Sequence, residues 1–272
     1  MKEYGYAYNT INNYKRSLKA AFYTAIEDDL IRKNPFNFSL DTVIEDDRTP
    51  KEPLSPEQET ALLAFVENDK TYSKYYDEIV ILLETGVRIS ELCGITLYDV
   101  DLDKERLTID HQLLKDTDIG YYVDEPKTED GKRIIPLSPS AYHAFIRVIK
   151  RRVKNSKINI DGYTDFLFTD SFGNPKVSGN YESVFRNLKS KFSKYNSLSL
   201  PEVFTPHTMR HTFCTNMANN GMTPNNLQYI MGHANIQMTL GYYAHASYES
   251  AEAEMSRIAE RRKAETKKGL VA

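Results

Sequence analysis

The chain has 272 residues, with 35 Lys and Arg against 38 Asp and Glu and a formal net charge of −3. This length is ample for a buried core, and the charge excludes a uniformly basic coat for nucleic acid. No apolar run approaches the roughly 20 residues that span a bilayer. The first residues lack the apolar core of a secretory signal, and two cysteines are too few for a disulfide framework. We therefore expect a cytoplasmic protein.

Charge is distributed unevenly along the chain. Residues 41–130 carry 24 acidic and 9 basic side chains, whereas residues 144–199 carry 11 basic and 4 acidic ones. This polarity predicts one face for an anionic partner, although solvated helix faces that merely differ in sign would give the same counts.

The N-terminal segment has a helical period. Apolar residues recur at three- and four-residue steps, namely Ile11, Tyr14, Leu18, Phe22 and Ala25. Thr10 is placed to cap this helix, and Asn34-Pro35 ends the pattern. One helix cannot bury its apolar stripe alone, so we interpret residues 1–40 as the remnant of a helical bundle. Residues 41–54 are polar, acidic and interrupted by proline, which predicts a linker.

A second domain is expected from residue 55 onward. Ser55-Pro56-Glu57-Gln58 predicts a helix start with a capping box. A buried helix over Ile79–Leu83 is expected to end at Thr85-Gly86, and another to begin near Ile89. The runs RLTID, GYYVDE and KRIIPL predict about three strands of one antiparallel sheet, with Pro126–Gly131 as the turn between the last two. The predicted fold class is mainly α with a small antiparallel β-sheet (α+β).

The segment from Thr205 to His211 has the clearest chemical character. A helix that begins at Thr205-Pro206 places His207, Arg210 and His211 on one side. Arginine beside histidine suits a phosphate, because the guanidinium group binds two oxygens and the imidazole shares a proton. Two histidines in this spacing could also bind zinc, but the metalloprotease pattern requires Glu where Thr208 stands. An ordinary helix turn with surface histidines is the remaining alternative.

Three other segments carry candidate residues. Arg88 lies near a predicted helix N-terminus, where anions bind readily, although a lone arginine there more often pairs with a carboxylate such as Glu91. Lys127 lies in the predicted hairpin turn, where lysines are usually just solvated. The third segment contains Gly232-His233 and, further along, the pair Tyr242-Tyr243.

Taken together and in this order, the segments resemble the catalytic domain of the tyrosine recombinases, also called phage-type integrases. The resemblance covers roughly residues 51–260. The first segment, ending DDLIRKNP, resembles the end of the family's helical core-binding domain. The strand-rich insert and the TxxxGYYAH segment are most similar to integrases of conjugative transposons and related phages. The implied domains are a partial core-binding domain (1–40), a linker (41–54) and a catalytic domain with a C-terminal helix and tail (55–272).

The resemblance implies a reaction and a set of residues. Such an enzyme cleaves and rejoins DNA through a 3′-phosphotyrosyl intermediate to integrate or excise a mobile element, without metal, ATP or cofactor. The implied catalytic residues are Arg88, Lys127, His207, Arg210, His233 and Tyr243. The two arginines would hold the nonbridging oxygens, and Lys127 would protonate the leaving oxygen. His207 would assist proton movement, His233 would hydrogen-bond the phosphate, and Tyr243 would be the nucleophile.

The nucleophile has an alternative. Some family members place it nine residues after the Gly-His histidine, which would select Tyr242. The Tyr-x-His context and the ten-residue spacing of transposon integrases select Tyr243.

The resemblance also implies partners. These are double-stranded DNA, a homotetramer on paired DNA sites and DNA-bending accessory proteins. A C-terminal helix near Ser247–Arg262 would pack against a neighbouring protomer or against its own domain. The alternatives are a chromosome-dimer-resolving recombinase, a type IB topoisomerase, a DNA-binding regulator that retains the fold without turnover, and a zinc hydrolase.

Overall fold

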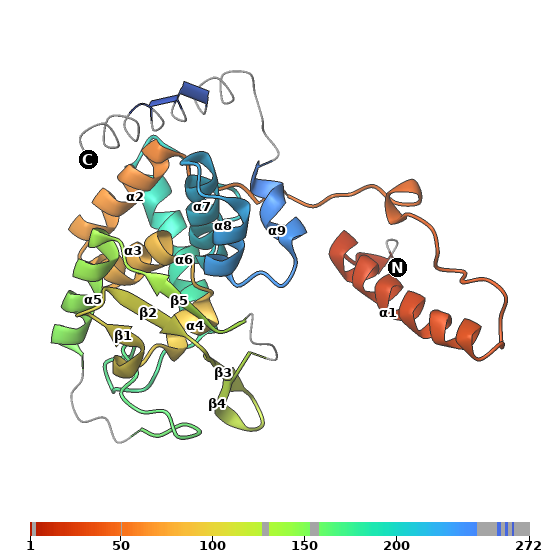
Figure 1. Ribbon diagram of the computed structural model, residues 1–272, viewed down its shortest axis with the longest axis horizontal. Coiled ribbons are helices and arrows are strands. Elements are labelled where there is room, and N and C mark those ends of the chain that lie inside the picture. The colour runs from red at the N-terminus through yellow and green to blue at the C-terminus, as the bar shows by residue number, and fades with distance from the viewer. Residues whose placement is uncertain are drawn as a thin grey trace. The chain divides into compact units, whose positions relative to one another are not determined.

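The structure is a computed structural model that describes residues 1, 4–49, 51–126, 131–152, 158–243, 255–256, 259–260 and 263. The chain forms two compact units, Met1–Lys51 and Glu52–Ala272. Figure 1 shows the first as the red helix with its orange extension and the second as the larger helical body. Among the described residues, no helix combines the length and the apolar character needed to cross a membrane.

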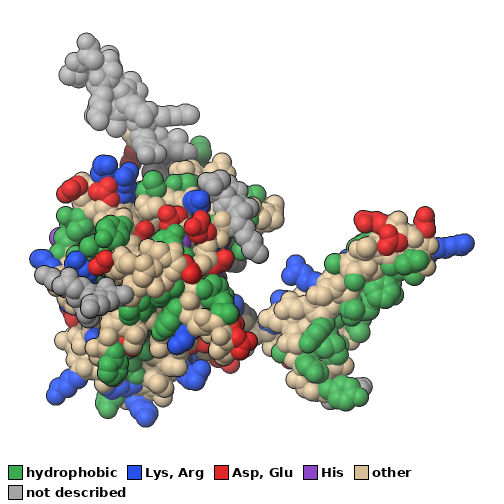
Figure 2. Space-filling model, turned by 90° about the horizontal axis from the view of Figure 1, so that it is seen from below, with side chains coloured by type: hydrophobic (Ala, Val, Ile, Leu, Met, Phe, Trp, Pro, Cys, Tyr) green, Lys and Arg blue, Asp and Glu red, His purple; other side chains and the backbone are tan. Residues whose placement is uncertain are grey.

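The N-terminal unit contains helix α1 (Tyr8–Glu27) and the short helix η2 (Leu40–Thr42). The chain returns along α1, with the rings of Phe22 and Phe36 5.1 Å apart. Asn34 donates a hydrogen bond to the Lys19 carbonyl (2.8 Å). Hydrophobic side chains nevertheless form a visible stripe along this unit (Figure 2). Within the unit itself, the apolar face of α1 is therefore only partly covered.

The ends of α1 differ from those predicted. Its N-cap is Ala7, and Thr10 lies inside the first turn, so the predicted cap is wrong. The helix stops at Glu27, well before Asn34-Pro35, because Asp29 adopts a left-handed backbone conformation (φ 56°). An aspartate tolerates this conformation better than most residues do. Local backbone geometry therefore ends the helix before the proline can.

The second unit begins with helix α2 (Pro56–Asn68), whose capping box is the predicted one. Gln58 N donates to Ser55 Oγ (3.2 Å), and Ser55 N donates to Gln58 Oε1 (2.8 Å). After the short helix η3 (Ser73–Tyr75), helix α3 (Tyr76–Thr85) runs through the core. It packs against α5 (Pro139–Arg151) and α7 (Pro206–Asn219). The prediction of a buried helix that ends at Thr85-Gly86 is confirmed.

Within the described residues, the strands form two small sheets instead of the one that was predicted. Helices α4 (Ile89–Gly94) and η4 (Leu97–Asp99) lead into the first sheet. Its strands, in the order β1-β2-β5 and all antiparallel, are Val100–Asp101, Arg106–Ile109 and Arg133–Pro136. The second sheet is a hairpin of β3 (Gln112–Asp116) and β4 (Gly120–Asp124), which projects from the lower edge of the body in Figure 1.

The predicted pairing of GYYVDE with KRIIPL is therefore wrong. GYYVD pairs instead with QLLKD, directly before it in the chain. A hairpin with a short loop closes at a smaller entropic cost than a pairing across a longer connection. Strands β4 and β5 consequently belong to different sheets and do not form a hairpin with each other. Lys127 itself lies outside the described residues.

The remaining helices complete the unit. Helix α6 (Ser178–Tyr195) buries an aromatic and aliphatic face, and α7 is followed by α8 (Pro224–Met231), α9 (Ile236–Leu240) and the turn η6 (Gly241–Tyr243). Helix α8 packs against both α7 and α9. The predicted class, mainly α with small antiparallel sheets, is confirmed. Of the predicted C-terminal helix Ser247–Arg262, most residues lie outside the described ones.

Candidate active site

The candidate site lies where α3 ends, α4 and α7 begin, and α8 ends. Gly86 ends α3 in a left-handed conformation (φ 64°). A Cβ atom at residue 86 would lie 2.3 Å from the Phe213 ring, so both the backbone conformation and the packing require glycine. This turn places Arg88 at the N-cap of α4, with its side chain half-buried.

Arg210 reaches the same place from the buried face of α7. The helix begins at Thr205-Pro206 as predicted, and Arg210 is only 3% exposed. Its two terminal nitrogens donate to the carbonyls of Gly86 and Met231. Burial, together with the positive charge of Arg88, lowers the Arg210 pKa to about 10, so the guanidinium stays charged at neutral pH.

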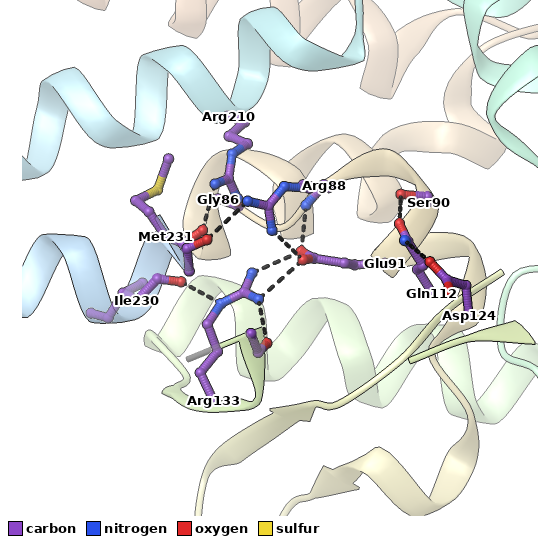
Figure 3. A network of polar contacts seen from close by, with 12 residues as sticks. Gly86, Arg88, Ser90, Glu91, Gln112, Asp124, Arg133, Arg210, Ile230 and Met231 are labelled. Carbon is purple, nitrogen blue, oxygen red and sulfur yellow. Dashed lines mark hydrogen bonds and ion pairs between the residues drawn. The ribbon is translucent and has the colours of Figure 1, made fainter. Parts of the chain in front are cut away.

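Glu91 joins the arginines and was not among the predicted catalytic residues. Its carboxylate accepts from the Arg88 side chain (2.7 Å) and the Arg88 backbone N–H (2.7 Å). It also accepts two bonds from Arg133 on β5. Burial alone would raise the Glu91 pKa, but its bonds and ion pairs with Arg133 and Arg88 lower it to about 2. Among the described residues, this network thus joins the arginines Arg88, Arg133 and Arg210 with the ionised carboxylate of Glu91 (Figure 3).

His233 follows the C-terminus of α8 and is 6% exposed. Its Nδ1 lies 2.9 Å from Thr239 Oγ1. Burial and the charges of Arg210, Arg88 and Arg133 lower the His233 pKa to about 4. The imidazole is therefore neutral at physiological pH, and it can act as a hydrogen-bonding group but not as a cation. His207 makes a smaller contribution to the lowered pKa of His233.

The two histidines of α7, His207 and His211, are less buried than His233. His207 is exposed in the first turn, and His211 is half-buried with its ring 4.9 Å from that of Tyr242. Within the described part of the chain, the only potential metal-ligand cluster is Asp99, Asp110 and His111. It includes neither histidine of α7, so nothing in that part supports the zinc alternative.

The two tyrosines lie in different surroundings. Tyr242 lies beside Cys214, and the charge of Arg210 acts on its hydroxyl, although burial raises the Tyr242 pKa overall. Tyr243 donates a hydrogen bond of 2.5 Å to the Met222 carbonyl, and burial raises its pKa. The structure therefore brings Arg88, Arg210 and His233 together, while the Tyr243 hydroxyl is engaged at the loop after α7.

Sequence reasoning missed Arg133, although a signal for it exists. The run KRIIPL was interpreted only as a strand. In β5, Arg133 and Ile135 are buried while Ile134 and Pro136 are exposed. An arginine on the inward face of a strand is a buried charge that needs a partner. Glu91 of the RISEL segment, distant in sequence but adjacent in space, is that partner.

Comparison with known proteins assigns the chain to a family. Residues 52–250 match the Phage integrase family, and the chain belongs to this family. It is 58% identical over 258 residues to the transposase from transposon Tn916 of Enterococcus faecalis. That match covers 95% of this chain and 64% of the relative, so the chain spans less than two thirds of the relative's length. The tyrosine recombinase XerC of Listeria monocytogenes is 25% identical over 251 residues, 92% of this chain and 75% of XerC.

Solved structures agree with this assignment. The Tn1549 transposon integrase in complex with a circular intermediate DNA superposes with a TM-score of 0.89 at 56% identity. The match covers 95% of this chain and 82% of that one. A tyrosine-to-phenylalanine variant of the same integrase, in complex with transposon right end DNA, gives a TM-score of 0.88.

Proposed function

We propose that this chain is a site-specific DNA recombinase that cleaves and rejoins double-stranded DNA through a 3′-phosphotyrosyl intermediate to integrate or excise a mobile element. The observation that carries the proposal is the cluster of Arg88, Arg210 and Arg133. Among the described residues of this cluster, only the Glu91 carboxylate opposes their charge, which leaves an excess of positive charge. The relatives support the same choice: identity to a transposon transposase is 58%, against 25% to XerC, which favours a mobile element over chromosome-dimer resolution.

The arginines are suited to a phosphodiester transition state. Negative charge develops on the nonbridging oxygens, and fixed cations in a desolvated site stabilise it strongly. A guanidinium has five N–H donors. Each terminal nitrogen of Arg210 donates one hydrogen bond, to the carbonyls of Gly86 and Met231. Each terminal nitrogen of Arg88 likewise donates one, to Glu91 and to the Gly232 carbonyl. Each side chain therefore retains donors that can bind an oxygen of the scissile phosphate.

His233 would act as a neutral hydrogen-bond donor. Its depressed pKa keeps the ring neutral. When Nδ1 accepts from the Thr239 hydroxyl, Nε2 carries the proton and can donate to the phosphate. His207, exposed in the first turn of α7, would assist proton movement. Lys127 would protonate the leaving 5′-oxygen as a general acid.

Tyr243 is the proposed nucleophile, and its activation requires a rearrangement. A phenol attacks as the phenolate, which nearby cations favour. The present surroundings of Tyr243 raise its pKa, and its hydroxyl bonds to the Met222 carbonyl. Attack would thus follow release of this bond and movement of the hydroxyl toward Arg88 and Arg210. Tyr242 is the alternative, since it already lies within the influence of Arg210.

The wider assembly is part of the proposal. The relatives' structures contain DNA, and we infer double-stranded DNA as the partner here, in the cytoplasm. Residues 1–40 would belong to a core-binding domain, residues 41–54 to a linker and residues 55–272 to the catalytic domain. A homotetramer on paired sites, with DNA-bending accessory proteins, would complete strand exchange.

The test is covalent capture of DNA. The protein is incubated, with EDTA present, with nicked duplexes drawn from the ends of the mobile element that encodes it, and SDS-resistant adducts are resolved on a gel. We expect an adduct from the wild type and from Tyr242→Phe but none from Tyr243→Phe.

Each contrary result has a defined meaning. An adduct lost only in Tyr242→Phe would transfer the nucleophile to Tyr242. DNA binding without any adduct would reject the recombinase and support a DNA-binding regulator. Relaxation of supercoiled plasmid without strand exchange would indicate a type IB topoisomerase.

A further inference from the structure

Arg133 is the most deeply buried charged side chain of the candidate site. It is the first residue of β5, and its side chain is 0% exposed. Burying a guanidinium requires a counter-charge and hydrogen-bond acceptors. Arg133 has both: Nη1 and Nη2 donate to Glu91 (3.0 and 2.7 Å), and Nε donates to the Ile230 carbonyl (2.6 Å).

Each carboxylate oxygen of Glu91 accepts one hydrogen bond from Arg88 and one from Arg133. Oε1 accepts from Arg88 Nη1 (2.7 Å) and Arg133 Nη1 (3.0 Å). Oε2 accepts from the Arg88 backbone N–H (2.7 Å) and Arg133 Nη2 (2.7 Å). In Figure 3 the carboxylate lies between the two guanidinium groups. One negative charge therefore faces two positive ones.

We propose that Arg133 is a positioning residue that holds the charge of Glu91 so that Arg88 keeps its positive charge available for the scissile phosphate; this rests on the proposed function. Without Arg133, the carboxylate would pair with Arg88 alone. In a buried site the resulting neutral pair attracts an anion far more weakly than a cation does. Glu91 would still hold the Arg88 backbone in place, but at the expense of the Arg88 charge.

Arg133 also helps to fix the turn that carries His233. Three consecutive carbonyls at the end of α8 each accept a bond from a different arginine. Ile230 O binds Arg133, Met231 O binds Arg210, and Gly232 O binds Arg88. Cations are favoured at the carbonyl end of a helix. The next residue is His233, so the three arginines together set the position of its ring.

Arg133 further connects this turn to β5. The Ile134 N–H donates to the Tyr229 hydroxyl (3.0 Å), one residue before the Ile230 carbonyl that Arg133 binds. Strand β5 follows directly on the segment that contains Lys127. Arg133 thus lies where the supports of Arg88 and His233 meet.

The experiment separates this role from simple stabilisation. Four proteins are compared by titration with inorganic phosphate at low ionic strength and by single-turnover cleavage of saturating nicked duplex: wild type, Arg133→Met, Arg133→Lys and the double variant Arg133→Met/Glu91→Gln. Arg88→Gln defines the loss of phosphate affinity expected when the cation is absent. Lys176→Met is the control, because it breaks another ion pair, between the partly buried Lys176 and the buried Glu78 (2.6 Å), at the opposite end of α3.

We expect Arg133→Met to weaken phosphate binding and slow cleavage by about tenfold or more, because Glu91 then neutralises Arg88. DNA affinity should change by less than about twofold, because most DNA affinity comes from other phosphate contacts. The double variant should regain phosphate affinity to within about threefold of wild type, because it has no unpaired buried carboxylate. A purely structural role predicts no such recovery. Lys176→Met should lower stability and leave phosphate affinity unchanged.

Two results would overturn the inference: a folded Arg133→Met with wild-type phosphate affinity, or a double variant that binds phosphate as poorly as the single one. If Arg133→Met does not fold, Arg133→Lys decides. Lysine lacks the fork that binds both Glu91 oxygens, but it retains the positive charge that offsets Glu91, so phosphate affinity should stay within about threefold. Loss of that affinity would refute the inference. The phosphate titration does not depend on cleavage. Normal phosphate responses without any adduct would therefore reject the recombinase and leave the role of Arg133 standing.

Discussion

The two ends of helix α3 both carry buried ionic groups, but their charges are arranged in opposite ways. At the N-terminal end the buried groups are acids. Asp77 pairs with Arg147 and Arg151, whose side chains are 49% and 44% exposed. Beyond the C-terminal end, buried cations outnumber buried acids among the described site residues. Arg133 and Arg210 are almost inaccessible, and the buried carboxylate of Glu91 pairs with Arg133 and Arg88.

The difference separates structural from functional charge. Exposed arginines around a buried acid are screened by water, so they balance that acid without creating a strong field. Buried arginines in excess over acids create a field that only an added anion can satisfy. We therefore expect substitutions beyond the C-terminal end of α3 to affect chemistry, and matched substitutions at its N-terminal end to affect stability alone.

The largest effect is expected for Arg210→Lys. Lysine cannot reproduce the planar fork that binds the Gly86 and Met231 carbonyls and leaves donors for the phosphate. Removing a preorganised donor of this kind slows catalysis by about 10²–10³-fold. Single-turnover cleavage at saturating DNA measures it. Arg151→Lys is the matched change at the other end of α3 and should cleave at the wild-type rate. Equal losses in the two variants would mean that the charges at the two ends of α3 do not differ in function.

The next effect is a pH dependence of stability that comes from His233. Its folded pKa is about 4, below the ordinary value of 6.5, because of burial and the adjacent arginines. In the unfolded chain His233 therefore binds a proton below about pH 6.5, whereas in the folded chain it binds one only below about pH 4. The free energy of unfolding should consequently fall as pH drops through this window, by about 2 kcal/mol. The contribution of Glu91 is lost only at lower pH, from 4.5 down to about 2.

Urea unfolding at pH 7 and pH 4.5 measures the His233 effect. His233→Gln should remove about 2 kcal/mol of the decline, whereas the exposed His143→Gln should leave the decline unchanged. If the free energy of unfolding declined equally in wild type and His233→Gln, burial and the arginines would not be lowering the His233 pKa.

Much of this arrangement follows from local sequence signals, and some of it does not. The capping box at Ser55, the glycine stop at Gly86 and the helix start at Pro206 depend on neighbouring residues, and the structure confirms them. The strand pairing was predicted wrongly, because choosing the partner of GYYVD depends on loop closure between segments. Arg133 and Glu91 are 42 residues apart, and no local pattern brings them together. The catalytic role of each site residue remains a prediction.

A smaller effect is expected for Gly232→Ala. Residue 232 adopts φ +59°, and a Cβ atom there would lie 2.9 Å from Arg133 Nη1. The left-handed conformation costs a residue with a side chain about 1–2 kcal/mol. The added methyl group would also push Arg133 away from Glu91. We expect stability to fall by that amount and cleavage by about tenfold.

Gly179→Ala is the matched control for this change. Gly179 lies in α6, and an added Cβ would meet nothing within 4 Å. Its stability should stay within about 1 kcal/mol of wild type, because alanine is the better helix former. If Gly232→Ala lowered stability without slowing cleavage, the turn at the end of α8 would have only a structural role, like the ion pairs at the N-terminal end of α3.

The smallest effect is expected for Ser90→Ala, which tests how far the functional cluster extends along α4. Ser90 Oγ donates to Gln112 Oε1 (2.7 Å), and Gln112 Nε2 donates to Asp124 Oδ2 (2.9 Å), which links α4 to the β3–β4 hairpin. Removing the hydroxyl should cost about 1 kcal/mol of stability. Cleavage should not change, because the backbone of Arg88 is fixed by Glu91 and not by Ser90. A cleavage defect larger than the stability loss would show that the hairpin helps to set Arg88, and the functional region would then reach across both small sheets.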